Sequence, residues 1–461
     1  LDAKADILVY GTGETQIVEI ARRLREGEDV KRLPPVRGTA ILRNSLEGYE
    51  DAVKIPSFEE VRGNKDKFNE AFRLHYAEND PVRGRTVAQK HGDRFVIQFP
   101  PALPLTTSEL DSVYGLPFAR DWHPVYDRVP GGKGERPAAG VPGFETVRFS
   151  ITSHRGCAGE CNFCALFAHQ GRIIQSRSPK SILEEVKRLV ARKDFKGTIT
   201  DLGGPTANLY GATCAQWELA GACRSKQCMM PGPCEQLRLG YEKTVRLWEE
   251  VMRVPGVKHL FIQSGLRYDL LTDEGSDAYL QALCKDHVSG RLKVAPEHVS
   301  EAVLKAMNKP PAEVYERFAS RFREVSRRLG KEQYLVNYFV SAHPGSRLEE
   351  AAELAAYLAQ KKLQPEQVQD FIPLPMTASA CMYHTGKNPW TGENIPVVKT
   401  YRDRQLQRAL VQSGQPQNKG QVLQALKELG RNDLGAILLP KDRHGRSSRP
   451  PRRASQRDGR R

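Results

Sequence analysis

Long apolar runs are missing from this sequence. It contains no stretch of about 18 apolar residues of the kind that crosses a membrane. It also lacks a charged start followed by an apolar segment, so no signal peptide is visible. These absences argue against a membrane or secreted protein, and we expect a cytoplasmic one. The first residue is Leu1 rather than Met, so we expect further residues upstream of it.

Aromatic residues are absent from the C-terminal end. From Lys441 to Arg461 the chain carries nine Lys or Arg against two Asp. Such a segment buries too little apolar surface to offset its ordering entropy, so we predict a disordered basic tail over 441–461. The net charge is +15, and this tail supplies +7 of it. The remaining +8 gives nucleic-acid binding only weak support.

Cysteine is spread unevenly along the chain. There are nine cysteines, an odd number, and seven of them fall between Cys157 and Cys234. This clustering argues for metal ligation rather than a disulfide framework.

A regular alternation of strand and helix patterns begins near residue 145. The predicted strands are 146–151, 198–202, 258–263, 292–295, 334–340 and 368–372. The predicted helices between and after them are 179–190, 241–254, 277–287, 312–329 and 348–361, with shorter ones near 405–410 and 421–429. This alternation predicts parallel pairing. The predicted fold class is α/β, with a partial (β/α)6 TIM-like barrel whose chemistry lies at the carboxyl ends of its strands.

The strongest motif follows the first predicted strand. Cys157, Cys161 and Cys164 have the spacing C-x3-C-x2-C, and three thiolates so close on one loop can converge on one centre. Thiolates select iron–sulfur clusters, zinc or copper(I). A cubane cluster with three protein ligands leaves one iron open to a small chelating ligand. Alternatively, His154 or His169 could complete a zinc site. We favour the cluster, because a zinc knuckle would not need a barrel.

This C-x3-C-x-aromatic-C motif resembles the signature of the radical S-adenosylmethionine (radical SAM) superfamily. The resemblance implies a [4Fe–4S] cluster whose open iron is chelated by SAM. It also implies reductive cleavage of SAM to methionine and a 5′-deoxyadenosyl radical, which abstracts a hydrogen atom from substrate. The segments 118–124, 155–178 and 382–389 narrow the resemblance to the YgiQ-type group.

The same resemblance implies further cofactor-binding residues at successive strand ends. Phe163 matches the aromatic position beside adenine and cluster. Gly203 and Gly204 match a SAM-contacting segment, although Pro205 replaces the usual Glu there. The other expected contacts are Ser264, Arg267 and Glu297.

The predicted domains follow from these patterns. The strand at 5–10 and the helix with apolar positions Ile17, Ile20, Ala21 and Leu24 read as one strand and one helix of a parallel α/β unit. This piece resembles the end of a Rossmann-like domain, and residues 30–140 look irregular. We therefore predict a Rossmann-like remnant and linker over 1–140 and the barrel over 141–375. Within the barrel we expect a Cys-rich insertion over 205–236, and after it a C-terminal extension over 376–440.

A second set of cysteines lies in the insertion. Cys214, Cys223, Cys228 and Cys234 sit among few apolar residues, and a structural metal could supply the missing order. We hypothesise a second cluster or a zinc ion there, with unliganded thiols as the alternative. Cys381 and Tyr383 are weak catalytic candidates for hydrogen-atom exchange, against a surface loop packed on the barrel.

The sequence thus predicts a radical SAM enzyme of unknown substrate, which needs a one-electron reductant such as flavodoxin or ferredoxin. The alternative is a zinc-stabilised nucleic-acid-binding protein.

Overall fold

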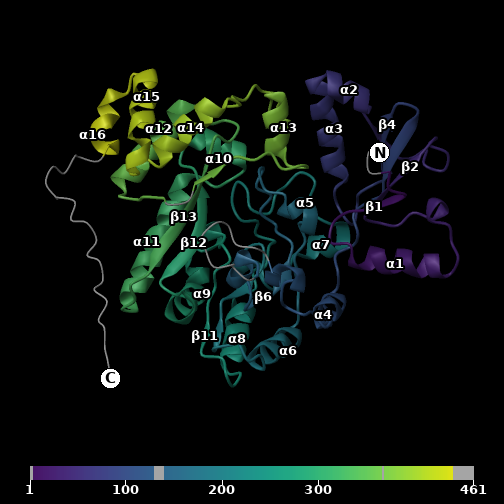
Figure 1. The fold of residues 1–461 in the computed structure, drawn as a ribbon, viewed down its shortest axis with the longest axis horizontal. Coiled ribbons are helices and arrows are strands. Elements are labelled where there is room, and N and C mark those ends of the chain that lie inside the picture. The colour runs from purple at the N-terminus through teal and green to yellow at the C-terminus, as the bar shows by residue number, and fades with distance from the viewer. Residues whose placement is uncertain (1–3, 129–139, 366–367, 440–461) are drawn as a thin grey trace, which may run out of the picture.

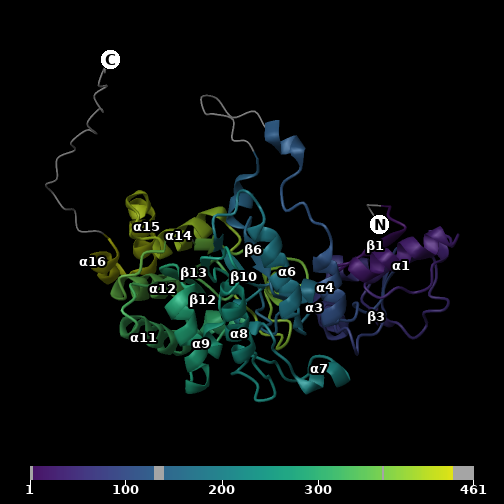
Figure 2. The ribbon, with the colours of Figure 1, turned by 90° about the horizontal axis from the view of Figure 1, so that it is seen from below.

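The computed structural model describes residues 4–128, 140–365 and 368–439. The predicted tail at 441–461 lies outside the described residues. Among the described residues, no helix has the length and apolar character needed to cross a membrane. Figure 1 shows the N-terminal elements at one side of a central group of strands and helices, and the last helices at the other side. The turned view in Figure 2 keeps this order.

The N-terminal part is built on a five-stranded sheet. Its strands are β1 (Ile7–Val9), β2 (Thr39–Arg43), β3 (Val53–Ile55), β4 (Val87–His91) and β5 (Arg94–Gln98), in the order β1-β2-β5-β4-β3. Only β3 and β4 pair in parallel, whereas β1 pairs antiparallel with β2. The prediction of a parallel α/β unit at the N-terminus was therefore wrong. The reason is that the chain leaving α1 (Glu14–Arg25) turns back and runs beside β1 in the opposite direction.

The apolar face predicted for α1 is largely exposed. Ile20 is buried, but the exposed fractions of Ile17 and Leu24 are 56% and 42%. The periodicity therefore located the helix correctly, while the described residues cover only part of the face it defines.

The sequence had suggested that segment 30–140 is irregular, and for its described residues 30–128 this was wrong. Besides four strands it contains α2 (Phe58–Gly63), α3 (Lys65–Glu78) and α4 (Thr107–Gly115). Both α2 and α4 begin with a capping box, formed by Ser57 with Glu60 and by Thr106 with Glu109. This Ser/Thr-x-x-Glu pattern was the local signal that could have placed their starts.

All six predicted strands have counterparts. They are β6 (Ser150–Thr152), β9 and β10 (Thr198–Ile199 and Asp201–Gly203), β11 (His259–Leu260), β12 (Arg291–Glu297), β13 (Tyr334–Ser341) and β14 (Val368–Asp370). The first begins four residues late, because Pro142–Thr146 forms a 3-10 turn. Every pairing among these strands is parallel, in the groups β6–β10, β9–β11 and β12–β13–β14. The short hairpin β7 (His154–Arg155) and β8 (Gln175–Ser176) is antiparallel. The protein is a mixed α/β protein.

The predicted helices around these strands are confirmed within two residues at each end, when the π-turn that continues α9 is counted. They are α6 (Pro179–Val190), α8 (Tyr241–Met252), α9 (Asp277–Ala282, followed by a π-turn to His287), α11 (Ala312–Arg328) and α12 (Leu348–Gln360). Ser178 caps α6 by accepting a hydrogen bond from the Ser181 amide, as expected of a Ser before a Pro at the first helical position. Of these helices, α6, α8, α9 and α11 pack with side chains of the strands in a large apolar core around Trp248, Phe318 and Phe322.

The remaining helices lie at loops and at the C-terminus. They are α5 (Leu166–Gln170), α7 (Ala215–Ala220), α10 (Glu301–Met307), α13 (Ala378–Thr385), α14 (Tyr401–Val411), α15 (Lys419–Leu429) and α16 (Gly435–Leu438). The helices α12, α14, α15 and α16 share a separate apolar core. Figure 1 shows α13 next to α3 of the N-terminal part, so the C-terminal segment reaches back across the central strands.

Candidate functional site

The first cysteine group lies on a loop that leaves the carboxyl end of β6. After the short strand β7, Gly156 turns the chain with φ 87°, a conformation that glycine adopts readily. A β-carbon at this position would lie 2.3 Å from the Ile173 carbonyl oxygen. The next amide, of Cys157, donates to the Gly171 carbonyl at 3.1 Å. The tight turn therefore directs the cysteine loop over the strand ends.

Neighbouring elements hold this loop by hydrogen bonds. The backbone amide of Asn162 donates to the Met307 carbonyl, and its side chain donates to the Ala306 carbonyl, at 2.9 and 3.0 Å. Asn308 returns a bond to the Glu160 carbonyl at 2.9 Å. The Ser379 amide at the start of α13 donates to the Asn162 carbonyl at 2.8 Å. The loop is thus fixed to the end of α10 and the start of α13.

A buried carboxylate also anchors the loop. Glu160 accepts from the Arg172 guanidinium at 2.9 Å and from the Tyr76 hydroxyl of α3 at 3.0 Å. Glu160 adopts a left-handed backbone conformation, with φ 46°. Because both partners approach a carboxylate that is 5% exposed, the N-terminal part contributes directly to the position of the cysteines.

Arg267 contacts the cysteine group from the loop after β11. Its Nη1 group lies 3.3 Å from the Cys161 sulfur. Its Nε and Nη2 groups donate to the two carboxylate oxygens of Asp269 at 3.0 and 2.5 Å. Burial disfavours its charged form, but Asp269 and then Cys161 outweigh this and raise the pKa of Arg267. A permanent positive charge therefore lies beside the thiols.

The three thiols are free and partly buried. Burial raises the pKa of Cys157, and it raises the pKa of Cys164 to about 12. Buried thiols ionise only beside positive charge, which a metal centre and a guanidinium both supply. In the described part of the chain, no three His, Cys, Asp or Glu side chains lie close enough to hold one metal ion. Thiolates are ligands of iron–sulfur clusters, so the donor set of three free cysteines on one loop fits such a cluster.

A cavity of about 590 Å³ opens at the strand ends beside this loop. Three of the predicted SAM-contacting residues, Gly203, Gly204 and Ser264, line it. It extends to the turn at the start of α1, and its lining also includes Thr12, Glu14, Thr152, His154, Arg155, His169 and Asp201. Polar groups from the N-terminal part and from the strand ends therefore face one space.

The two glycines of this cavity have a packing role. A β-carbon on Gly203 would lie 2.4 Å from the Ser264 hydroxyl oxygen. A β-carbon on Gly204 would lie 2.6 Å from the His154 ring. Ser264 donates its hydroxyl to Asp201, whose other oxygen accepts from the Gln263 and Ser264 amides. Sequence reasoning missed Asp201 as the residue that fixes this turn, although it stands only two residues before Gly203.

His154 stands out among the cavity residues. It is fully buried, which lowers its pKa to about 4, so the ring is neutral near pH 7. Its Nδ1 atom lies 2.9 Å from the Ser153 hydroxyl, whereas Nε2 has no hydrogen-bond partner among the described residues. A buried polar atom without a partner indicates a site that a ligand or water completes.

The other predicted residues fall in different places. Phe163 packs edge-on to His343 and, with Tyr383, against the apolar group of Met307 and Phe371. Glu297 is buried at the end of β12 with φ 68°, and burial raises its pKa. Cys381 points to the N-terminal part instead, and its sulfur lies 3.0 Å from the Asn69 side-chain oxygen on α3. Tyr383 is thus the catalytic candidate beside Phe163, and Cys381 lies at the contact with α3.

The second cysteine group surrounds α7. Cys214 is buried, and Cys228 and Cys234 pack with it in an apolar group that also includes Trp217 and Cys157 of the first loop. Burial raises the pKa of Cys228 to about 12, with smaller effects from Glu160, Cys223 and Cys234. These cysteines are therefore near one another and near the first loop.

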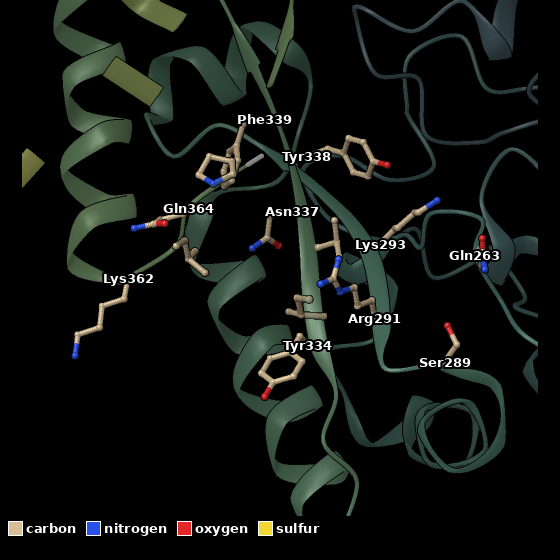
Figure 3. A pocket seen from close by; sticks show the side chains of 14 residues that line it. Gln263, Ser289, Arg291, Lys293, Tyr334, Asn337, Tyr338, Phe339, Lys362 and Gln364 are labelled. Carbon is tan, nitrogen blue, oxygen red and sulfur yellow. The ribbon is translucent and has the colours of Figure 1, made fainter. Parts of the chain in front are cut away.

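A further cavity of about 590 Å³ lies beside β12 and β13. Figure 3 shows Arg291 and Lys293 from β12 with Tyr334 and Tyr338 from β13 around it. Among the described residues, which leave out 366 and 367, β14 pairs with Phe339–Ser341 and not with the first half of β13. None of the predicted site residues lines this cavity.

Comparison with known families agrees with this arrangement. The model of the radical SAM N-terminal region matches residues 1–150, and that of the radical SAM superfamily matches residues 151–358. A domain of unknown function, DUF3362, matches residues 366–459. The chain belongs to the radical SAM superfamily.

Curated relatives narrow the assignment further. A UPF0313 protein of Methanocella arvoryzae is 47% identical over 433 residues, which are 94% of this chain and 70% of that protein. One from Clostridium botulinum strain 657 is 44% identical, over 94% of this chain and 66% of its own length. One from Methanosarcina acetivorans is 43% identical, over 94% and 60%. Within the superfamily, the chain belongs to the UPF0313 family, the YgiQ-type group, and spans about two thirds of the length of these relatives.

Solved structures overlap more loosely. The cobalamin-dependent SAM radical enzyme OxsB, with aqua-cobalamin and SAM bound, matches 92% of this chain and 55% of its own, with a TM-score of 0.48 and 11% identity. The radical SAM methyltransferase TsrM from Kitasatospora setae matches 82% and 55%, with a TM-score of 0.39 and 15% identity. These overlaps are too loose to place a ligand in this chain.

Proposed function

We propose that this chain is a radical SAM enzyme that binds a [4Fe–4S] cluster through Cys157, Cys161 and Cys164 and reductively cleaves SAM. The observation that carries the proposal is the set of three free thiols on one anchored loop, with the Arg267 guanidinium against one of them. When bound, the cluster supplies the single electron that divides the SAM sulfonium into methionine and a 5′-deoxyadenosyl radical. A one-electron reductant such as flavodoxin or ferredoxin would provide that electron.

The chain's own residues hold and shield this chemistry. Gly156 and the end of α10 fix the loop over the strand ends, and Glu160 ties it to α3. The strand-end cavity is large enough for a small ligand. Its Ser264 and Asp201 are already joined, whereas Nε2 of His154 has no hydrogen-bond partner among the described residues. We assign SAM to this cavity, next to Gly203 and Gly204, and keep Phe163 and Glu297 as predicted contacts.

We also propose that the parallel strands form a partial six-stranded barrel. The segment 198–203 pairs with β11 through its first half and with β6 through its second, so it joins two of the ladders. An isolated parallel bridge between Leu266 and Val294 connects the segment after β11 to β12. Strand order 1 to 6 with helices between strands is the arrangement of a βα barrel that has not closed.

For the second cysteine group we propose an auxiliary metal centre. The support is the nearness of Cys223 and Cys234 to Cys228, and the place of Cys228 and Cys234 against an apolar group. Thiolates suit either zinc or an iron–sulfur cluster, and we propose a cluster here. The Cys228→Ser variant should lose part of the iron and sulfide while keeping one cluster per chain. Full metal content in that variant would contradict this centre.

The experiment for the main proposal is anaerobic reconstitution, followed by counting of iron, sulfide and zinc and by addition of SAM and dithionite. Wild type should hold iron and sulfide and form 5′-deoxyadenosine, and Cys161→Ala should form none. Cys284→Ala is the matched control, because Cys284 is buried in the apolar core around Trp248, which does not include the cysteines of the loop. Zinc without sulfide in wild type would overturn the proposal.

A further inference from the structure

Arg267 is held in place more firmly than a ligand-binding side chain needs to be. Its guanidinium is bidentate to Asp269, and both residues are buried, with 6% and 5% of their surfaces exposed. Its backbone amide donates to the Asn208 side-chain oxygen, and its carbonyl accepts from the Asn208 side-chain nitrogen, both at 2.9 Å. Backbone and side chain are therefore fixed before any ligand arrives.

The space around the guanidinium is shaped to let it reach the sulfurs. A β-carbon on Gly159 would lie 2.7 Å from Nη1 of Arg267 and 3.3 Å from the Cys157 sulfur. The backbone of Gly159 is not in the left-handed region, so its lack of a side chain is not needed for the turn. What requires glycine there is the approach of the guanidinium to the cysteines.

We propose that Arg267 is a positioning residue that donates a charge-assisted hydrogen bond to the Cys161 thiolate and thereby raises the reduction potential of the cluster. This inference rests on the proposed function, because it presupposes a cluster on Cys161. A reduced cluster is more negative than an oxidised one, so a nearby cation and a hydrogen bond to sulfur stabilise the reduced form. Asp269 orients the guanidinium and leaves its Nη1 side free for the sulfur. Arg267 thus acts on the cluster's electronic properties, in place of the SAM contact that the family resemblance implied.

The test is a redox titration of the reconstituted cluster without SAM, followed by electron paramagnetic resonance. Arg267→Gln removes the cation, and Gly159→Ala pushes the guanidinium away while keeping every charge. At the potential that half-reduces the wild-type cluster, we expect the ratio of reduced to oxidised cluster to fall about tenfold in Arg267→Gln. That ratio corresponds to about 59 mV for a one-electron couple. Gly159→Ala should shift the ratio in the same direction by a smaller factor.

Iron and sulfide are counted first in each variant. Arg253→Gln is the control, because Arg253 is an exposed residue directly after α8 and its substitution should leave the potential unchanged. If Arg267→Gln fails to take up iron, Gly159→Ala decides alone. The inference is overturned if Gly159→Ala takes up a full cluster and keeps the wild-type potential. It is also overturned if the variants weaken SAM binding but leave the potential unchanged. Wild type without iron and sulfide would overturn the proposed function itself, so the two failures are distinct.

Discussion

The two cysteine groups occupy neighbouring loops but are built in different ways. The first is held by polar contacts: Glu160 with Arg172, Asn162 with α10, and Arg267 on Cys161. The second is held mainly by apolar packing around Trp217 and Met229 and by backbone bonds. Burial raises thiol pKa values in both groups, and the first loop in addition has the Arg267 guanidinium against a cysteine sulfur. The difference suggests that an electron is taken up at the first group.

The largest expected difference between the groups is in activity. Cys164→Ala should abolish 5′-deoxyadenosine formation, because a cubane with two protein ligands is not retained on the loop. Cys223→Ala should leave most of it, since the first cluster stays in place. Both variants are assayed with SAM and dithionite after reconstitution. Equal loss of activity in both would show that the two groups form one functional unit.

The next effect concerns the buried charge of the first loop. Glu160→Gln leaves Arg172 without its partner and should lower the free energy of unfolding by about 3 kcal/mol, the cost of breaking a buried ion pair. Glu235→Gln in the second loop changes an exposed carboxylate and should stay within about 0.5 kcal/mol. Urea unfolding followed by circular dichroism measures both. A similar small effect for the two variants would contradict a polar anchor at Glu160.

The glycines of the two loops should differ in the same sense. Gly156→Ala forces a left-handed backbone on alanine and sets its β-carbon against the Ile173 carbonyl, so it should cost about 1 to 3 kcal/mol. In the second loop, a β-carbon on Gly232 meets nothing within 4 Å, so Gly232→Ala should be nearly neutral. Iron retention after gel filtration gives a second measurement. Retention equal to wild type in Gly156→Ala would mean that the turn can relax.

The last comparison is a pH dependence of stability. Burial lowers the pKa of His154 to about 4 and of His298 and His343 to about 3, whereas the insertion at 205–236 contains no histidine. These rings stay neutral in the folded state while the unfolded chain takes up protons below about pH 6.5, so stability falls as pH falls from there toward 3. Each ring contributes a slope of up to about 1.4 kcal/mol per pH unit. His343→Gln should reduce the slope of the free energy of unfolding against pH, measured with urea between pH 6 and 4. The reduction should be at most the slope that one bound proton gives. An unchanged slope would mean that His343 is protonated in the folded state.

The sequence predicted most of the central fold, because its helices have clear apolar periodicity and its strands are short apolar runs between turn residues. It failed in the N-terminal part, where exposed apolar positions on α1 and short strands gave no such period. Among the candidate site residues, the cysteine motif was readable because its members are close in sequence. The contact between Arg267 and Cys161 joins residues 106 positions apart, and no local pattern encodes it.

The contact between α13 and the cysteine loop has a consequence for how the protein is made. The contact between Cys381 and Asn69 spans 312 positions, and the bond from Ser379 to Asn162 spans much of the same chain. During synthesis the loop and α3 therefore leave the ribosome long before α13 does. Until then the loop lacks its hydrogen bond to Ser379, so its final position is reached only after the C-terminal segment has been made.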